Sequence, residues 1–328
     1  MTYRPPFTVS AAAITKIAEI SALVERYVIR MEQEDCLRLR KANRIKTIQG
    51  SLAIEGNTLS EDQITAILEG KRIVAPIREI QEVKNAIEVY DQYSSLNPYS
   101  LDDILEAHAI MMEALIDAPG RFRTSGVGVV AGTQVIHMAP PAERVPELMS
   151  DLFDWLELSS DHLLIRSCVF HYEFEFIHPF TDGNGRMGRL WQSLLLGQLH
   201  PVFQYLPVES MVHDNQQEYY EAINLSTKKA DSGIFIDFML NEIWLTLKRH
   251  VDTSSVGVNI GVNVGVKILE YIRMHPGCRA NVIAEAVGIT TRTVERHIRQ
   301  LREQGKIEFQ GAPKTGGYYI FGVKNDKR

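Results

Sequence analysis

A short segment, His178–Arg189, reads HPFTDGNGRMGR and brings together several groups that bind phosphates. Its tripeptide Gly183–Gly185 can bend so that consecutive backbone N–H groups point into one concavity, and a helix that begins there adds its dipole to this anion-binding site. Arg186 and Arg189 are three residues apart on that helix, so they share a face. Two guanidinium groups beside such a concavity predict a site for several phosphates rather than for one carboxylate.

Two further side chains of the segment suit a transfer reaction at these phosphates. The carboxylate of Asp182 would be repelled by phosphate oxygens unless a cation lay between them, and Mg²⁺ commonly bridges the two. The imidazole of a histidine ordinarily has a pKa of about 6.5, so His178 can take a proton from a hydroxyl group at neutral pH. The segment therefore predicts phosphoryl or nucleotidyl transfer, although the Walker pattern GxxxxGK[ST] is absent. The alternative is a loop glycine cluster beside a core histidine.

Helices are the elements expected to position this segment. Pro179 disfavours helical backbone at His178, so the preceding helix should end near Ile177. Ser60 and Gln63 form a capping-box pattern, and Gly56 supplies a left-handed helix end. Valine, threonine and glycine in Arg121–Met138 predict a β-hairpin. The apolar spacing predicts helices at about 8–31, 32–55, 60 onward, 78–96, 101–115, 146–158, 161–176, 184–199, 216–225 and 234–251.

Composition describes an ordinary globular protein with an uneven charge. The 328 residues are 45% hydrophobic and 23% charged, and no apolar run reaches the roughly 20 residues that span a bilayer. The N-terminal sequence has no apolar signal region, and the three cysteines form no CxxC pair, so a cytoplasmic protein without disulfides or membrane attachment is expected. Residues 267–328 carry 12 Lys and Arg against 6 Asp and Glu, whereas the remainder is acidic.

The basic C-terminal part has the pattern of a small α+β domain. Helices are expected at about 267–274, 280–287 and 291–304, followed by strands at 306–309 and 318–321, an order that resembles a winged helix-turn-helix. Arg292, Arg296 and Arg299 form a stripe on the third helix. Because winged helices also dock proteins, DNA binding and protein docking both stay open. Before this part, 256–266 places an aliphatic residue at every second position, which predicts an extended linker or strand.

The segment HPFTDGNGRMGR resembles the signature HxFx[D/E]GNGRxxR of the Fic family. The resemblance extends over about 101–251. It implies transfer of AMP from ATP to a Ser, Thr or Tyr hydroxyl of a protein, the chain itself included, with release of pyrophosphate. It assigns His178 as the general base and Asp182 as the ligand of Mg²⁺, and Phe180 would anchor the loop in the core.

The resemblance also assigns an ATP-binding set and a docking segment. Arg186 would bind the β/γ end of the triphosphate, Arg189 the γ-phosphate, and Tyr220 with Tyr219 would flank the adenine. The ATP-binding set is Gly183, Asn184, Gly185, Arg186, Met187, Gly188, Arg189 and Tyr220. The hairpin would pair with a segment of the target protein as an added strand. Its docking residues are Gly132, Thr133, Gln134, Val135, Ile136 and His137.

An upstream segment, Ser51–Asn57, reads SLAIEGN and resembles the family's inhibitory pattern [S/T]xxxE[G/N]. Ser51 and Glu55 are four residues apart and share a helix face. A carboxylate in the last turn of a helix faces the negative end of the dipole, so Glu55 either has a partner outside the helix or lies exposed at a frayed helix end. The resemblance implies that Glu55 pairs with Arg189 and withholds it from ATP. A role for Glu55 in removing AMP is left open.

These observations predict a mainly α protein: a Fic-type helical bundle with a β-hairpin flap and a small winged-helix domain. The expected parts are an N-terminal helical region (1–100), a catalytic core (101–251), an extended segment (252–265) and a winged helix-turn-helix (266–328). A homodimer is also expected. The alternative function is that of a DNA-binding regulator, in which the Fic-like part is a sensor or transfers a different nucleotide or phospho-group.

Overall fold

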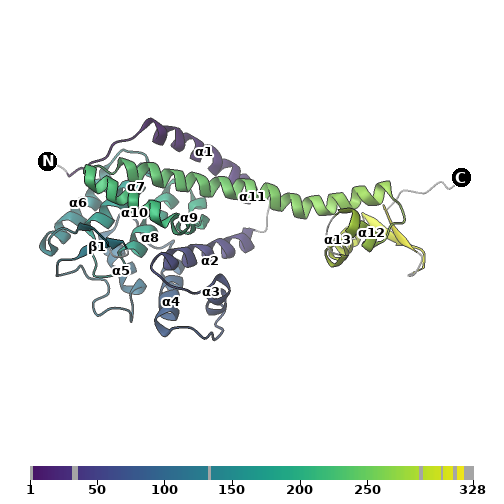
Figure 1. The fold of residues 1–328 in the computed structure, drawn as a ribbon, viewed down its shortest axis with the longest axis horizontal. Coiled ribbons are helices and arrows are strands. Elements are labelled where there is room, and N and C mark those ends of the chain that lie inside the picture. The colour runs from purple at the N-terminus through teal and green to yellow at the C-terminus, as the bar shows by residue number, and fades with distance from the viewer. Residues whose placement is uncertain are drawn as a thin grey trace. The chain divides into compact units, whose positions relative to one another are not determined.

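The computed structural model describes residues 3–31, 36–131, 134–287, 291–303, 306–312 and 316–320. It divides into two compact units, Met1–Arg249 and His250–Arg328 (Figure 1). Helices make up most of both units, and two separate two-stranded antiparallel sheets are present in the described residues. The mainly α class is therefore confirmed. None of the described helices combines the length and the apolar character needed to cross a bilayer.

The first unit is built from helices with one hairpin. Its elements are α1 (Ala11–Met31), α2 (Cys36–Ile54), α3 (Glu61–Leu68), α4 (Ile77–Asp91), α5 (Leu101–Met111), β1 (Gly128–Ala131), β2 (Gln134–Met138), η1 (Ala142–Arg144), α6 (Val145–Leu158), α7 (Leu163–Ile177), α8 (Asn184–Leu199), η2 (Pro201–Tyr205), α9 (Val208–Asp214), α10 (Gln216–Lys229) and the first part of α11 (Gly233–Met274).

Helices α7 and α8 form the centre of this unit. Most residues of α7 are buried, both apolar ones such as Phe170 and Phe174 and polar ones such as His171. Helix α8 packs along it and buries Leu190, Trp191 and Leu195. The indole N–H of Trp191 donates to Pro98 O at 2.9 Å, so its polar atom is satisfied in the core. The segment that joins these two helices therefore rests on the most deeply buried part of the unit.

Helix α2 is held by close backbone packing. Ile48 and Leu52 are buried, and α2 packs against α9. A side chain at Gly50 would lie 2.7 Å from the backbone of Ser210, so only glycine allows this approach. The helix ends at Ile54, and Gly56 follows with φ of +91°, which confirms the predicted left-handed stop.

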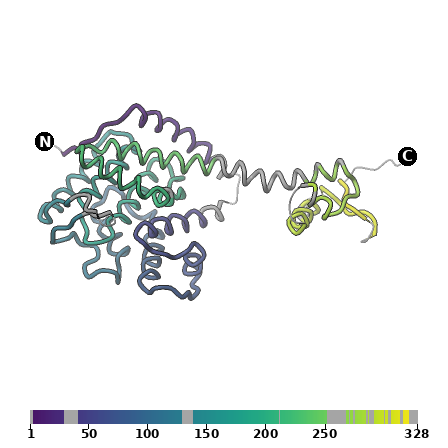
Figure 2. Tube along the Cα trace, viewed as in Figure 1, coloured from purple at the N-terminus to yellow at the C-terminus, as the bar shows by residue number. Residues whose placement is uncertain are grey.

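Helix α1 lies along the first part of α11, as the two traces show (Figure 2). Ser10 Oγ donates to Asp237 Oδ1 at 2.6 Å at the start of α1, and the ammonium group of Lys16 lies 3.3 Å from the ring centre of Trp244. A cation over an indole ring is a favourable contact. The N-terminal segment is therefore part of the first unit.

Several local predictions are confirmed. Ser60 and Gln63 form the capping box, with each side chain bonded to the other residue's backbone. The hairpin is present but shorter than expected, and its ladder has an irregularity between Val129 and Val130. Of the predicted docking residues, Gly132 and Thr133 lie outside the described residues. Gln134–His137 belong to β2.

Helix α11 corrects the prediction for residues 252–265. This segment was expected to be extended, but α11 runs without interruption from Gly233 to Met274. A spacing of two residues contains a spacing of four, so an alternating pattern in the sequence is also compatible with a helix. Extending an existing helix by one residue is much easier than nucleating a new one. The period-two pattern was therefore not specific for a strand.

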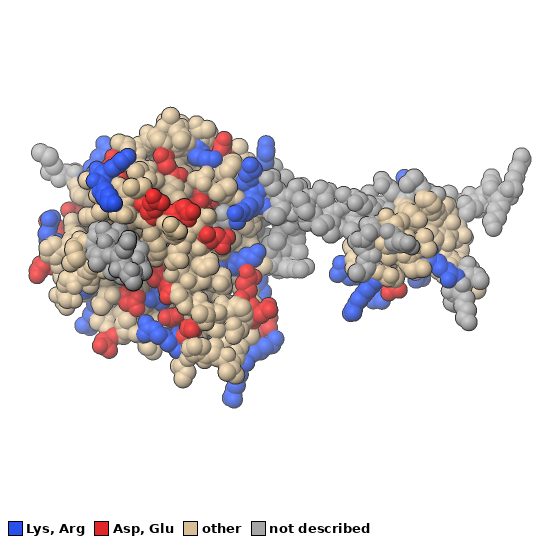
Figure 3. Space-filling model, viewed as in Figure 1, with Lys and Arg blue, Asp and Glu red and all other residues tan. Residues whose placement is uncertain are grey.

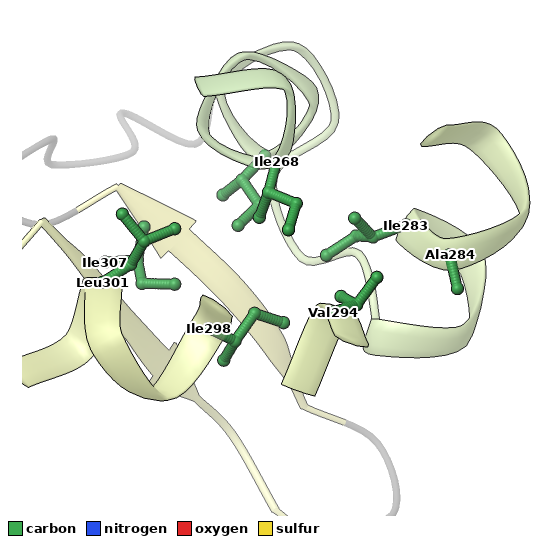
Figure 4. Close-up of a cluster of buried hydrophobic side chains, with 8 residues drawn as sticks. Ile268, Ile283, Ala284, Val294, Ile298, Leu301 and Ile307 are labelled. Carbon is green, nitrogen blue, oxygen red and sulfur yellow. The ribbon is translucent and has the colours of Figure 1, made fainter. Parts of the chain in front are cut away.

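The second unit contains a small apolar core (Figure 4). Helices α12 (Ala280–Val287) and α13 (Thr291–Glu303) pack on the end of α11, and β3 (Ile307–Gln310) pairs with β4 (Gly317–Ile320). The core consists of Ile268, Ile272, Ile283, Ala284, Val294, Ile298, Leu301 and Ile307. The predicted helices at 267–274, 280–287 and 291–304 and both predicted strands correspond to these elements.

The core of the second unit can be tested with Ile298→Ala. Ile298 is buried at the centre of this core, and truncation of a buried isoleucine costs about 2–5 kcal/mol. We expect amide hydrogens of α13 and β3 in the full-length protein to exchange about 30-fold faster or more, measured by hydrogen–deuterium exchange. Arg299→Ala changes the next, exposed residue and should have little effect. Equal protection in the two variants would contradict this core.

Candidate active site

The segment between α7 and α8 is a tightly bonded loop. Helix α7 ends at Ile177, as predicted, and His178 has a left-handed backbone with φ of +51°. The side chain of Asn184 donates to Phe180 O and accepts from Phe180 N, both at 2.9 Å. Phe180 is fully buried, in agreement with its expected position as an anchor. The loop is therefore closed on itself before α8 begins.

His108 of α5 contacts the loop between α7 and α8. Its ring stacks on Phe180 with 3.6 Å between ring centres, and Gly120 N donates to its Nδ1 at 2.9 Å. Since Nδ1 accepts, Nε2 carries the proton and donates to Asp182 O at 3.0 Å. Burial lowers the pKa of His108 to about 4, so the ring is neutral. His108 was not predicted as part of the site, because a single histidine on a helix is uninformative.

Glu55 lies over the first turn of α8. Gly183, with φ of +85°, precedes this helix, and the backbone at Gly185 lies directly beneath the Glu55 carboxylate. A Cβ at Gly185 would lie 2.5 Å from Glu55 Oε1 and 2.8 Å from Arg189 Nη1. The space beside the helix N-terminus, where an anion is favoured, therefore holds a carboxylate.

The predicted pair of Glu55 and Arg189 is present. Arg189 Nη2 donates to Glu55 Oε1 at 2.7 Å and to Ser51 O at 2.9 Å, and Nε donates to Ser51 Oγ at 3.3 Å. Arg189 is 3% exposed, whereas the Glu55 side chain is 34% exposed. Burial lowers the pKa of Arg189, but Glu55 and other neighbouring groups outweigh this effect and the pKa is raised. The buried guanidinium therefore has a charged partner that reaches the surface.

Asp182 and Arg186 belong to a second charge cluster with two residues of α4. Asp182 accepts from Gly183 N at 2.6 Å and from Arg186 Nη2 at 3.2 Å, and its other oxygen lies 3.4 Å from Arg78 Nη2. Glu82 Oε1 lies 3.4 Å from Arg78 Nε and 4.0 Å from Arg186 Nη1. Arg78 and Glu82 were not predicted, because they lie about 100 residues before the motif.

Arg186 keeps free donors within this cluster. The residue is 3% exposed, and its Nε and Nη1 atoms have no hydrogen-bond partner among the described residues. A buried polar group without a partner is costly. An anion with several oxygens, such as a phosphate chain, would satisfy these donors, so the site fits the predicted triphosphate.

The remaining residues predicted to bind ATP differ in how deeply they are buried. Met187 and Gly188 are buried between α8 and α7, and a Cβ at Gly188 would lie 2.8 Å from Glu175 Oε1. Tyr219 is also buried, and its hydroxyl bonds to His171 Nε2 at 3.0 Å, which makes it part of the core. Tyr220 is half-buried, with its pKa raised by burial and by the charge of Glu55. Of the two tyrosines, Tyr220 lies closer to the surface.

Glu175 is a buried carboxyl beneath the ion pair. Burial is the main cause that raises its pKa to about 8, while Arg189 lowers it and Glu55 raises it further. Its Oε1 atom has no hydrogen-bond partner among the described residues. Arg189 therefore lies close to two carboxyl groups, and burial keeps one of them, Glu175, protonated near neutral pH.

Two family profiles match separate parts of the chain. The Fic/DOC family profile matches residues 98–196, which include the loop and α8. The profile of winged helix-turn-helix DNA-binding domains matches residues 265–308. The predicted C-terminal winged helix is thereby confirmed, and its match begins within α11.

Curated relatives and solved structures agree with these matches. Protein adenylyltransferase fic-1 of Caenorhabditis briggsae is 33% identical to this chain over 226 residues, which cover 63% of this chain and 42% of the relative. Protein adenylyltransferase fic-1 of Caenorhabditis elegans is 32% identical over 216 residues, which cover 61% of this chain and 40% of the relative. The chain thus spans less than half of these relatives. A crystal structure of a Fic family protein from Desulfovibrio desulfuricans G20 is 41% identical, with a TM-score of 0.77 over 98% of this chain and 100% of that chain.

The raised pKa of Glu175 predicts a pH-dependent stability. Between pH 4.5 and about 8 the folded protein keeps a proton on this carboxyl that the unfolded chain loses, so stability falls as the pH rises through this window. Glu175→Gln removes that loss. The difference between the thermal unfolding midpoint of Glu175→Gln and that of the unmodified protein should increase by about 3–6 °C from pH 5.5 to pH 8.5. The exposed Glu157→Gln should show no such trend. A difference for Glu175→Gln that is constant with pH would contradict the assignment.

Proposed function

This chain belongs to the Fic family, and from that premise we propose that it is a protein adenylyltransferase whose activity Glu55 inhibits. The relatives named protein adenylyltransferase support the reaction. The observation that supports inhibition by Glu55 is its ion pair with Arg189, in which Glu55 Oε1 lies 2.7 Å from Arg189 Nη2. An arginine of the phosphate-binding motif is thereby bound to a carboxylate from a different part of the chain.

The proposed reaction transfers AMP from ATP to a protein hydroxyl. His178 accepts the proton of the attacking hydroxyl, the oxygen bonds to the α-phosphorus, and pyrophosphate leaves. Arg186 binds the β/γ end of the triphosphate through donors that have no partner in the described structure. The backbone N–H groups at the start of α8 hold the phosphate oxygens. Arg189 binds the γ-phosphate once Glu55 releases it.

Mg²⁺ is the proposed cofactor. Asp182 is a single carboxylate, 41% exposed, at the edge of the phosphate-binding concavity. Mg²⁺ is usually held by one or two carboxylates together with substrate phosphates, so this donor set suits the ion. When bound, the ion would neutralise charge on the phosphates. Before that, Asp182 must exchange its contacts with Arg78 and Arg186.

The inhibition follows from competition between anions. Glu55 Oε1 lies both at Arg189 and over the backbone of Gly185, so a phosphate cannot occupy the same space. Arg189 is buried, and an ion pair to a buried arginine is screened less by water than a surface pair. The nucleotide must therefore displace a well-placed carboxylate before its γ-phosphate reaches Arg189.

Glu55→Gly should raise AMP transfer by about tenfold or more, which corresponds to removal of about 1.4 kcal/mol of competition for Arg189. The measurement is labelling of the protein and of added target proteins with radioactive ATP and Mg²⁺, with mass spectrometry to identify AMP. Addition of His178→Ala should abolish the labelling, and labelled UTP should not replace ATP.

Glu69→Gly is the matched control for this measurement. Like Glu55, Glu69 follows the last turn of a helix and precedes a left-handed glycine, but it pairs with Lys41 and Lys71 at the surface. Its labelling should equal that of the unmodified protein. Equal labelling of Glu55→Gly and the unmodified protein would remove the inhibitory role of Glu55.

A second function, DNA binding, is favoured by the surface of α13. Arg292, Arg296 and Arg299 are exposed on this helix. Lys and Arg side chains gather along one side of the second unit in Figure 3, where few acidic groups are visible. The helix corresponds to the recognition helix of a winged helix-turn-helix, which reads the major groove. We propose that this unit directs the enzyme to DNA.

Substitution of Arg292, Arg296 and Arg299 by glutamine tests this second function. If each arginine neutralises one phosphate, the triple variant should bind weakly and its log–log salt slope should be smaller by about 3. Fluorescence anisotropy of the full-length protein with a labelled duplex between about 50 and 200 mM salt measures both quantities. Arg26→Gln, an exposed change on α1, is the control. No binding by the unmodified protein at the lower salt would exclude this function.

A further inference from the structure

Arg123 is a buried arginine outside the motif and outside every predicted site. It is 3% exposed and lies in the irregular segment between α5 and β1. Burial lowers its pKa, which the charge of Glu143 offsets in part. Its guanidinium donates to four backbone carbonyl oxygens. A buried cation bonded to this many carbonyls is a specific arrangement that lysine cannot reproduce, because an ammonium group lacks the planar fork.

Two of these carbonyls belong to the end of α7. Arg123 Nε donates to His178 O at 2.7 Å, and Nη2 donates to Ile177 O at 3.2 Å. The backbone N of Arg123 also donates to Pro179 O at 2.9 Å. The last carbonyls of a helix have no partner within the helix, so this one residue satisfies three consecutive carbonyls at the catalytic loop. It also stabilises the left-handed backbone of His178, a conformation that costs a non-glycine residue about 1–2 kcal/mol.

The other two carbonyls flank the hairpin. Nη1 donates to Ser125 O at 2.8 Å, before β1, and Nη2 donates to Pro140 O at 2.6 Å, after β2. Between these positions, Ala139 N donates to Val127 O at 3.1 Å and continues the ladder. One guanidinium therefore fixes both ends of the hairpin to the backbone of His178.

We propose that Arg123 is a positioning residue for the transfer step, because it sets the distance and orientation between His178 and a hydroxyl presented along the hairpin. This inference rests on the proposed function. In the step, the hydroxyl proton passes to the imidazole of His178, the hydroxyl oxygen bonds to the α-phosphorus, and the bond from that phosphorus to the pyrophosphate oxygen breaks. Arg186 and Arg189 lie on α8 at the other end of the loop and are not bonded to Arg123, so ATP binding does not depend on this residue.

The test compares Arg123→Lys and Arg123→Gln in the Glu55→Gly protein. A reacting group displaced by about 1 Å can cost about 100-fold in rate, so we expect kcat for AMP transfer to fall by about that factor. The dissociation constant of ATP, measured by calorimetry on the same proteins, should change by less than about twofold, since the phosphate-binding groups are unaltered. Arg121→Lys, an exposed change two residues earlier, is the matched control and should transfer AMP at the rate of Glu55→Gly.

Two outcomes of the transfer assay overturn this inference, and a third overturns the proposed function instead. Transfer by Arg123→Lys at the rate of Glu55→Gly overturns it. A parallel loss of kcat, ATP affinity and thermal stability also overturns it, because Arg123 would then act only on folding. If Glu55→Gly itself transfers no AMP, the proposed function fails, and hydrogen exchange decides the role of Arg123 separately. Faster exchange of 176–180 together with 125–128 and 138–141 in Arg123→Lys supports the link to the hairpin, and unchanged exchange removes it.

Discussion

A guanidinium that is buried at the start of a helix requires an anion, and the site of this protein is organised around that requirement. Arg189 is 3% exposed, and Glu55 supplies the negative charge. Removal of a partner from a buried ion pair leaves an uncompensated charge, which is strongly unfavourable. A phosphate of the same sign satisfies the arginine equally well. The proposed competition between Glu55 and the γ-phosphate of a nucleotide follows from this constraint.

The loop around His178 is held in a different way, because its backbone is hydrogen-bonded to three buried side chains. His108 bonds to the carbonyl of Asp182, Asn184 closes the loop on Phe180, and Arg123 bonds to the carbonyls that follow α7. By contrast, the charged groups at its edge are partly exposed. The side chains of Arg78 and Asp182 are 57% and 41% exposed, and exposed ion pairs of this kind contribute little stability. The backbone of the loop is therefore held by buried hydrogen bonds, whereas the ionic contacts at its edge are partly exposed, as the proposed binding of a nucleotide requires.

The sequence could predict those parts of the fold and the site in which the interacting residues are close together in the chain. The motif, the end of α7 and the capping box at Ser60 were predictable, because spacing within one element decides them. The contact between Glu55 and Arg189 required a family resemblance, and Arg123, His108 and Arg78 gave no local signal because folding alone brings them to the loop. Local pattern also misassigned 252–265, since a helix that begins at Gly233 continues through a period-two sequence.

Release of Glu55 does not require α2 to leave its position. The helix is fixed by Ile48, Leu52 and the backbone approach at Gly50, whereas Glu55 lies beyond its last residue and its side chain is 34% exposed. A rotation of that one side chain into water would vacate the space above Gly185 and leave the buried contacts intact. Gln216 Nε2 donates to Ile54 O at 2.9 Å and holds the adjoining carbonyl in place. The contact between Glu55 and Arg189 can therefore open through a local change at the end of α2, with a much smaller loss of packing than a movement of the helix would cause.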